Sequence, residues 1–123
     1  MTVRDVVSIL DAEIHTGHDL LDKPVSAACG SDLMSDVIAF VKDEVALLTG
    51  LNTIQAVRTA LIMDVTVLIL VRGKTPSKEM IALAKESGIA ILTTNLPMFL
   101  ACGTLYSSGL IRGGTRKIGR DTE

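Results

Sequence analysis

The sequence predicts an α/β fold, a three-layer α/β/α sandwich around a mainly parallel central sheet of about five strands. Short apolar runs alternate with segments of helical period along the chain, which is typical of this class. Residues 65–71 are almost continuously apolar, as in a strand that is covered on both faces. The hydrophobic fraction is 48%, yet the chain has two Phe, one Tyr and no Trp, so we expect an aliphatic core.

The N-terminal segment is predicted to be a helix over 2–10, because its apolar side chains recur at helical spacing. Thr2 and Asp5 have the spacing of a capping box at its start. A short strand is expected at 12–16, and Gly17 ends it. The residues expected on the buried face of the helix are Val3, Val6, Val7 and Leu10.

The next strand and helix carry a polar junction. A polar loop over 18–24 ends in proline and leads to a second strand at 25–29. Either Ser31 or Asp32 is expected to cap the following helix, which ends near Lys42. By helical spacing, its apolar positions are Leu33, Met34, Val37, Ile38 and Val41.

Two strands enclose a helix in the middle of the chain. The continuous apolar run 45–49 is predicted to be a strand, and Asn52 opens a helix that ends near Met63. The run 65–71 follows almost at once and is assigned to the central parallel strand, with 72–76 as its exit loop. The residues expected on the buried face of the helix are Ile54, Val57, Leu61 and Ile62.

Capping signals define the last elements. Ser77, directly after a proline, is expected to cap a helix that ends at Gly88. A strand is expected at 89–92, and Pro97 lies in the first turn of a final helix, where its missing N–H costs nothing. The residues expected to face the core are Ile81, Leu83 and Ala84 in the first of these helices and Met98, Phe99, Cys102 and Leu105 in the last.

The length of 123 residues fits one domain, and no linker divides the chain. We expect a single domain over 1–110. Residues 111–123 are rich in glycine and basic side chains and are expected to form a polar tail. This tail is either solvated, or an arm that binds phosphate, or a segment that pairs with the sheet edge of a neighbouring subunit.

Charge and cysteine usage limit the classes of partner. The formal net charge is −2, so no field favours nucleic acid or an anionic membrane, and the scarcity of aromatic residues disfavours base stacking. No apolar run approaches the ~20 residues that span a bilayer. Cys29 and Cys102 are far apart and outside any CxxC motif. They are expected to be reduced, buried thiols of a cytoplasmic protein.

Small polar residues follow three of the predicted strands, each at the start of a helix. Because the carboxyl ends of parallel strands meet at one edge of a sheet, these loops are expected to converge there, with helix N–H groups that suit an anion. Ordinary helix capping is the competing interpretation, since Ser, Thr, Asp and Asn are the usual caps. The candidate ligand-binding residues are Gly30, Ser31, Asp32, Ser35, Thr49, Asn52, Thr53, Thr93, Thr94 and Asn95.

The common catalytic motifs are missing from the sequence. It has no GxxxxGK[ST], complete GxGxxG, GxSxG or HExxH pattern, so no catalytic residue and no cofactor is assigned. His15 and His18 lie close to Asp19 and Asp22, but without Cys or Glu partners they are expected to be surface residues rather than metal ligands. A small hydrolase or transferase that uses Asp32 or His18 is the least favoured interpretation.

The polar junction also carries a family resemblance. Residues 22–26 read Asp-Lys-Pro-Val-Ser, and residues 29–37 read Cys-Gly-Ser-Asp-Leu-Met-Ser-Asp-Val. This order resembles the DRTGG domain, in which an acidic-basic pair and small residues precede a strand and a Gly/Cys-Asp-Leu-(Leu/Met)-Ser-x-Val element. The likeness continues through 88–94 and covers most of the chain. At the naming motif itself, this chain has Lys23 where the family has arginine, and Ser26 begins the pair that replaces the two glycines.

The resemblance implies a regulatory and dimer-forming module. The family resembles the N-terminal domain of HPr kinase/phosphorylase and occurs attached to phosphotransacetylases and beside CBS domains in regulated pyrophosphatases. We therefore expect a non-catalytic regulatory or small-ligand-binding module that acts as a homodimer and senses a nucleotide or phosphorylated metabolite. The alternative is a protein-interaction subunit that docks on an enzyme or transporter without a ligand of its own. The mean hydropathy of +0.45 favours an exposed apolar patch of this kind.

Overall fold

The computed structural model describes residues 1–38 and 43–113, which form a five-stranded sheet. The strand order is β1-β5-β4-β3-β2, and all neighbours are parallel except β1, which pairs antiparallel with β5. This confirms the predicted α/β fold with a mainly parallel sheet. The strands are β1 (Glu13–Thr16), β2 (Ala27–Gly30), β3 (Val45–Thr49), β4 (Val67–Leu70) and β5 (Ala90–Thr93).

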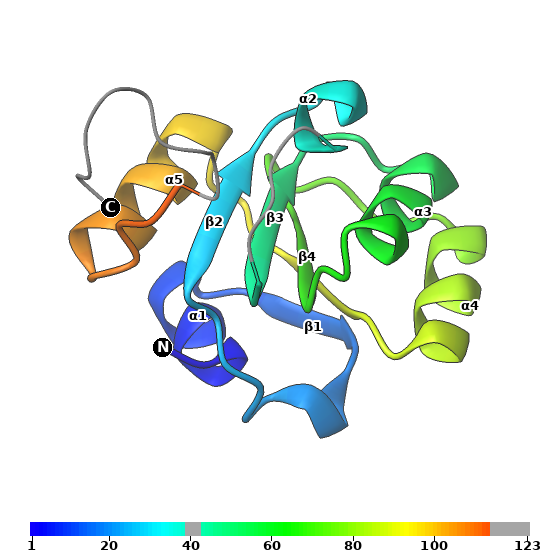
Figure 1. Ribbon diagram of the computed structural model, residues 1–123, viewed down its shortest axis with the longest axis horizontal. Coiled ribbons are helices and arrows are strands. Elements are labelled where there is room, and N and C mark those ends of the chain that lie inside the picture. The colour runs from blue at the N-terminus through cyan, green and yellow to red at the C-terminus, as the bar shows by residue number, and fades with distance from the viewer. Residues whose placement is uncertain (39–42, 114–123) are drawn as a thin grey trace.

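Helices cover both faces of the sheet (Figure 1). α2, α3 and α4 lie on one face, and α1 and α5 lie on the other, which gives the three predicted layers. The helices are α1 (Val3–Leu10), α2 (Met34–Ile38), α3 (Ile54–Ile62), α4 (Lys78–Ser87) and α5 (Met98–Ser107), and a short 3-10 helix spans His18–Leu20.

The strand order explains this division of the helices. Each step from β2 to β5 places the next parallel strand beside the last one, always in the same direction across the sheet. Parallel crossovers are right-handed, so connections that all move in one direction lie on one face. α2, α3 and α4 therefore share a face. The opposite face is covered by α1, which precedes the sheet, and by α5, which follows it.

β4 is the centre of an aliphatic core, as predicted. All of its residues, Val67 through Leu70, are fully buried. Leu68 and Leu70 enter the core on the side of α2, α3 and α4, whereas Val67 and Ile69 enter the core on the side of α1 and α5. A strand that is apolar on both faces is stable only between two helical layers. The unbroken apolar run was therefore a reliable signal for the central strand.

Three predicted helix caps are present. At α1 the Asp5 N–H donates to Thr2 Oγ1 at 3.2 Å and the Thr2 N–H donates to Asp5 Oδ2 at 2.8 Å, which completes the capping box. At α4 the Met80 N–H donates to Ser77 Oγ at 3.2 Å. Gly88 ends α4 with φ of +72°, in the left-handed region that glycine adopts without strain.

The predicted buried face of α3 was wrong in part. Leu61 and Ile62 are 41% and 69% exposed. The residues that face the sheet are instead mostly small, with Ala56, Val57 and Ala60 fully buried. Alanine allows the helix backbone to lie close to the flat sheet. Close packing therefore selects a face with small side chains, and the larger aliphatic residues turn outward.

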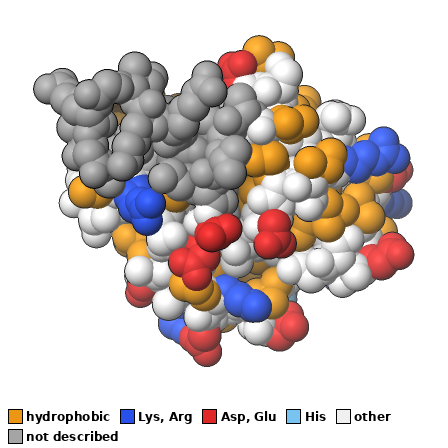
Figure 2. All heavy atoms as spheres, in the orientation of Figure 1, with side chains coloured by type: hydrophobic (Ala, Val, Ile, Leu, Met, Phe, Trp, Pro, Cys, Tyr) orange, Lys and Arg blue, Asp and Glu red, His pale blue; other side chains and the backbone are white. Residues whose placement is uncertain are grey.

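Three other apolar residues that were predicted to be buried are exposed. Leu33, just before α2, and Ile38, in α2, are 58% and 46% exposed, and Phe99 on α5 is 84% exposed. Figure 2 shows hydrophobic side chains at the surface over α2 and α3. Of the described residues of α2, Met34 and Val37 enter the core. The predicted position Val41 lies outside the described residues.

The C-terminal segment begins along the edge of the sheet. Leu110 is buried, and the backbone N–H of Ala28 in β2 donates to the Arg112 carbonyl at 3.0 Å. The start of the predicted polar tail is therefore tied to β2, and residues 114–123 lie outside the described part of the chain. Within that part, no helix has the length and apolar character needed to cross a membrane.

The antiparallel edge strand β1 depends on a buried hydroxyl and a glycine. The pairing with β5 shifts register between Ile14 and Thr16. Thr16 fills the irregularity, since its Oγ1 donates to the Ile89 carbonyl at 2.8 Å and accepts the Ile91 N–H at 2.9 Å. Gly17 follows with φ of +87°, and a Cβ there would lie 2.6 Å from Cα of Ala90. Only glycine fits this turn.

We predict that Thr16→Val lowers the free energy of unfolding by about 1–3 kcal/mol, because it leaves two buried backbone groups without a partner. The matched control is Thr59→Val. Thr59 Oγ1 is also buried but has no hydrogen-bond partner, so the change should leave stability unchanged or raise it. Urea denaturation of both variants measures the difference. Equal destabilisation by the two changes would contradict the role given to Thr16.

Candidate functional site

The carboxyl ends of β2, β3, β4 and β5 lie at one edge of the sheet, because these strands are parallel. The loops that follow them bring together most of the residues singled out in the sequence. Hydrogen bonds join each loop to the next one along the edge. The three polar loops therefore lie along one edge, and the loop after β4 separates the loop after β3 from the loop after β5.

Asp32 links two of these loops rather than capping α2. Its Oδ1 accepts the Gly50 N–H at 2.6 Å and the Thr49 hydroxyl at 3.0 Å. Thr49 Oγ1 in turn accepts the Leu51 N–H at 3.1 Å. The prediction that Asp32 caps the helix was wrong, because the next strand end offers it two buried donors. Ser31 has the local role instead, since its Oγ accepts the Leu33 N–H at 3.0 Å.

Arg72 supplies the cation of the site and was missed in the sequence. It follows β4, and its Nη2 lies 3.8 Å from Asp32 Oδ2, with 52% of the side chain exposed. The guanidinium lies against Gly50, where a Cβ would collide with it. The backbone of Arg72 has a φ of +62°, in the left-handed region, which non-glycine residues rarely adopt. The only available signal was the position of Arg72 directly after the central strand.

The loop after β5 has a structural role in this edge. Thr94 is buried, and its hydroxyl donates to the Leu10 carbonyl at 3.0 Å, which ties α1 to the loop. The N–H groups of Arg72 and Gly73 donate to the Leu96 and Thr94 carbonyls at 2.8 Å and 2.9 Å. The hydroxyl of Thr94 is therefore engaged inside the protein and is not free for a ligand.

The two neighbours of Thr94 in the chain differ in accessibility, since Thr93 is half-buried and Asn95 is exposed. Thr93 Oγ1 lies 2.9 Å from Nε2 of His15 on the adjacent strand β1. Asn95 is exposed, and its Oδ1 lies 3.2 Å from the place where a Cβ on Gly73 would be. Of these predicted residues, Asn95 is the one that can reach a molecule bound at the edge.

The remaining candidates divide between the edge and other surfaces. Asn52 Nδ2 donates to the Thr75 carbonyl at 3.0 Å, which joins the loops after β3 and β4. Thr53 is the N-cap of α3 but makes no side-chain capping bond, so the first N–H groups of α3 have no side-chain acceptor. Ser35 is exposed on α2. Gly30 faces α5, where a Cβ would lie 2.7 Å from Cys102 Sγ, so it serves packing.

The topology limits the depth of this site. Open α/β sheets bind ligands mostly in the crevice where the strand order reverses. Between β2 and β5 the order never reverses, so the described loops pack against one another instead of opening a crevice between parallel strands. The groups that face solvent at the edge are the Arg72 guanidinium, Asn95 and the start of α3. Together they suit a shallow site for an anionic group.

The residues considered for catalysis do not come together. Asp32 lies at the carboxyl edge, whereas His18 follows Gly17, which packs against Ala90 at the opposite, amino-terminal edge of the sheet. Within residues 1–38 and 43–113, no group of three or more His, Cys, Asp and Glu side chains has the arrangement of a metal site. The geometry gives Asp32 a structural and electrostatic role rather than a histidine partner.

Comparison with known proteins identifies the family. The DRTGG domain profile matches residues 5–105, which is most of the chain. The chain belongs to the DRTGG domain family. A curated protein with a matching sequence was not found. The fold is similar to a crystal structure of the CBS and DRTGG domains of the regulatory region of Clostridium perfringens pyrophosphatase, complexed with its activator, diadenosine tetraphosphate.

That structure aligns with a TM-score of 0.73 at 22% sequence identity, covering 96% of this chain and 51% of the pyrophosphatase fragment. At this identity the similarity confirms the fold, and the profile match confirms the family that the polar junction resembles. The present chain spans about half the length of the fragment it matches.

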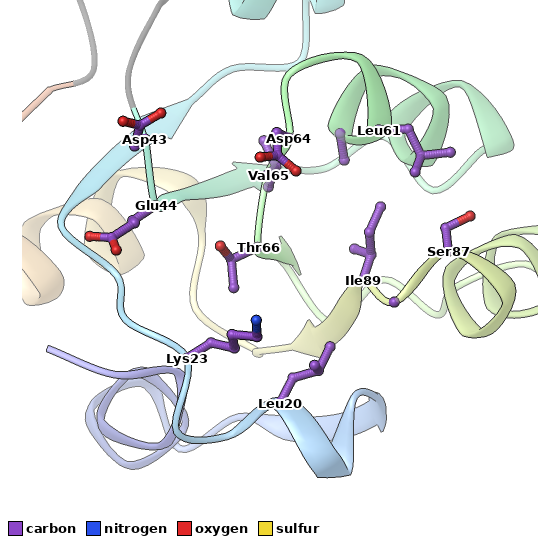
Figure 3. Close-up of a pocket in the computed structure, with 12 residues that line it drawn as sticks. Leu20, Lys23, Asp43, Glu44, Leu61, Asp64, Val65, Thr66, Ser87 and Ile89 are labelled. Atoms are coloured by element: carbon purple, nitrogen blue, oxygen red, sulfur yellow. The ribbon is translucent and has the colours of Figure 1, made fainter.

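A cavity of about 400 Å³ lies at the edge of the sheet where the parallel strands begin, and the sequence analysis missed it (Figure 3). Lys23 extends toward it from one side. Asp43, Glu44 and Asp64 lie on the other. These residues are far apart in the sequence and gave no local pattern. The lining residues are Leu20, Lys23, Asp43, Glu44, Ala60, Leu61, Asp64, Val65, Thr66, Ser87, Gly88 and Ile89.

The two cysteines are free thiols in the DRTGG domain. Cys29 is buried on the side of α2 and α3, whereas Cys102 is half-buried on the side of α5. Burial raises the pKa of the Cys29 thiol to about 12, with smaller contributions from the charges of Cys102 and Asp36, and burial also raises the pKa of Cys102. Both thiols are therefore protonated at neutral pH, as expected for structural cysteines.

We predict that Asp32→Ala lowers the free energy of unfolding by about 1–3 kcal/mol, because the buried Gly50 N–H and Thr49 hydroxyl lose their acceptor. Asp32→Asn keeps an acceptor oxygen and should recover most of this loss. Asp36→Ala, an exposed carboxylate on α2, is the control and should be nearly neutral. Urea denaturation measures stability, and amide hydrogen exchange of Gly50 reports the local bond. Unchanged exchange at Gly50 in Asp32→Ala would refute the link between the loops.

The raised pKa of Cys29 predicts slow alkylation in the native state. Since the pKa rises from 9.0 to about 12, the thiolate fraction near pH 8 falls roughly a thousandfold below that of the unfolded chain. Between pH 9 and about 12 the unfolded thiol ionises while the folded one keeps its proton, so stability falls as pH rises. Mass spectrometry after iodoacetamide treatment, native against urea-unfolded, tests this. Equal modification of Cys29 in both states would contradict it.

Proposed function

We propose that this DRTGG domain is a non-catalytic regulatory module of the cytoplasm that binds an anionic metabolite or nucleotide and acts as a homodimer. The observation that carries the proposal is the Arg72 guanidinium, half-exposed at the carboxyl edge and held beside Asp32 and the Gly50 backbone. A planar, permanently charged group with free N–H donors is the usual partner of phosphate.

Neighbouring groups support an anion at this place. The N-terminus of α3 carries a partial positive charge, and Thr53 leaves its first N–H groups without a side-chain acceptor. Lys74, which is exposed in the loop after β4, adds a second cation close to Arg72 in the chain. Asp32 offsets part of this charge, so binding is expected to be modest and dependent on salt.

The family supports a regulatory role. The similar DRTGG domain belongs to the regulatory region of a pyrophosphatase, in a complex with the activator diadenosine tetraphosphate. A module of this kind needs a ligand or a partner rather than a reaction centre.

The alternative, a protein-interaction subunit without a ligand of its own, has support from a different surface. Phe99 and Tyr106 on α5 are exposed and apolar, as in docking surfaces. The two functions separate experimentally, because an interaction subunit would not be stabilised by small anions.

We predict that ATP, diadenosine tetraphosphate or a sugar phosphate raises the melting temperature of the wild-type chain. A ligand at a hundredfold excess over Kd adds about 2.7 kcal/mol of stability. Arg72→Gln should abolish the shift because it removes the guanidinium that is expected to bind the anion. Arg58→Gln, which removes an exposed cation from α3, is the matched control and should keep it.

Calorimetry of the same compounds, with Lys23→Gln as a further variant, locates the ligand. Loss of binding in Lys23→Gln but not in Arg72→Gln would place the ligand in the amino-terminal cavity and refute the carboxyl-edge site. No shift with any of these compounds would refute the ligand-binding function.

A further inference from the structure

The aromatic residues of this chain are unusually placed. The sequence has two Phe, one Tyr and no Trp. Two of these three residues, Phe99 and Tyr106, lie on α5 with exposed fractions of 84% and 62%, and the third, Phe40, lies outside the described residues. Aromatic side chains are enriched in interfaces and dominate their energetics. A core made of aliphatic residues beside exposed aromatic residues indicates a surface built for contact.

α5 is apolar on both sides. Its inner side, with Ala101 and Leu105 fully buried, packs on the sheet and on α1. Its outer side exposes Phe99, Leu100 and Tyr106. The helix from Met98 to Ser107 contains no charged residue. Surface helices normally turn a charged stripe to solvent, and a helix that is apolar all round is covered on all sides. Within residues 1–38 and 43–113, the outer side of α5 is therefore left without a cover.

The exposed area is appropriate for the centre of a dimer interface. A fully exposed aromatic side chain offers ~150–250 Å². At their exposed fractions, Phe99 and Tyr106 together present roughly 300 Å² of mostly apolar surface. Leu100 and Ile111, about half exposed, extend it on either side. A standard interface buries ~800 Å² on each partner, with an apolar core and a polar rim. Ser107 and Ser108 provide polar groups at the border of this patch.

We propose that the outer side of α5 is the surface through which a second copy of this chain binds. This rests on the homodimer of the proposed function and names its interface. A twofold axis places each surface against itself, so a charged surface would bring like charges together. α5 itself carries no charge and is therefore compatible with its own copy, and the neighbouring cation Arg112, which lines the cavity beside Tyr106, belongs to the segment after the helix.

Gly103 lies between Phe99 and Tyr106 on this surface. Beyond the backbone of its own helix, no described heavy atom lies within 4 Å of the place where its Cβ would be, so a second helix can approach the backbone there. If two α5 helices cross antiparallel at Gly103, Phe99 of one copy lies beside Tyr106 of the other, because the two residues are four before and three after the crossing point. Each dimer then contains two identical aromatic contacts.

A cavity next to Tyr106 can receive the ring of Phe99. This cavity, of about 430 Å³, lies between α5, the edge of β2 and the segment that starts at Leu110. Its apolar walls include Leu105, Leu110 and Ile111. An aromatic anchor in an apolar cavity at the centre of an interface is the usual form of a binding hot spot. The geometry thus gives Phe99 both a neighbour and a place to be buried.

Sedimentation equilibrium of the full chain at tens of micromolar tests the interface. The wild type should be a dimer. The double variants Phe99→Glu with Tyr106→Glu and Phe99→Lys with Tyr106→Lys should each weaken the dimer by at least about tenfold, because each brings like charges together. Both residues are exposed, so circular dichroism should show an unchanged fold. Ile62→Glu, on the exposed side of α3, is the matched control and should remain dimeric.

Mixing the acidic and basic variants gives the sharpest outcome. In the antiparallel arrangement every aromatic contact becomes a Glu–Lys pair, so the 1:1 mixture should form a heterodimer although neither variant dimerises alone. Tyr106 is the only tyrosine and there is no tryptophan, so tyrosine fluorescence on dilution reports directly on this surface.

Two results would overturn the proposal and are distinct from each other. Double variants that stay dimeric like the wild type would show that the homodimer uses another surface. A wild type that is monomeric at tens of micromolar would refute the homodimer together with its interface, while the anion titration of the Arg72 variant would still test the ligand-binding function separately.

Discussion

The buried parallel sheet determines the rest of this molecule. β4 is apolar on both faces, so a helical layer must cover each of them. Because the crossovers from β2 to β5 all move in one direction, α2, α3 and α4 cover only one face. The chain must therefore return across the carboxyl edge after β5 and cover the other face with α5. The return segment, Thr94 to Pro97, lies at that edge as a consequence of this constraint.

The return across the edge explains why the polar loops bind one another. The backbone N–H groups of Arg72 and Gly73 donate to carbonyls of the return segment, and the carboxylate of Asp32 accepts from the end of β3. Buried polar groups must be paired, and here the neighbouring loops supply the partners. What remains for a ligand is the charge of Arg72 and the start of α3. The candidate site thus consists of the few polar groups at this edge that are not used to join one loop to the next.

Local signals predicted the fold well, because they act over a few residues. Thr2 with Asp5, Ser77 and Gly88 marked helix ends correctly, and the run 65–71 marked the central strand. The buried side of α3 could not be predicted, since Ala56 and Ala60 face the sheet only because close packing favours small residues there. The role of Asp32 depends on donors in another loop, and Lys23 and Asp64 come to line one cavity only in the folded chain. Such pairings have no sequence period and require the tertiary structure.

The return segment also connects the two surfaces on which function is proposed. Leu96 accepts the Arg72 N–H and stands one residue before Pro97, the N-cap of α5. A ligand that engages Arg72 would act on a residue that is hydrogen-bonded to the loop just before α5, the helix proposed to form the dimer interface. If the ligand favours the dimer, the dimer must bind the ligand more tightly by the same factor, because binding free energies are reciprocal. A ligand with equal affinity for both states would shift nothing. If the proposed dimer is regulated by a ligand at Arg72, the ligand must distinguish monomer from dimer, and the loop shared by Arg72 and α5 offers a hydrogen-bonded route between the two surfaces.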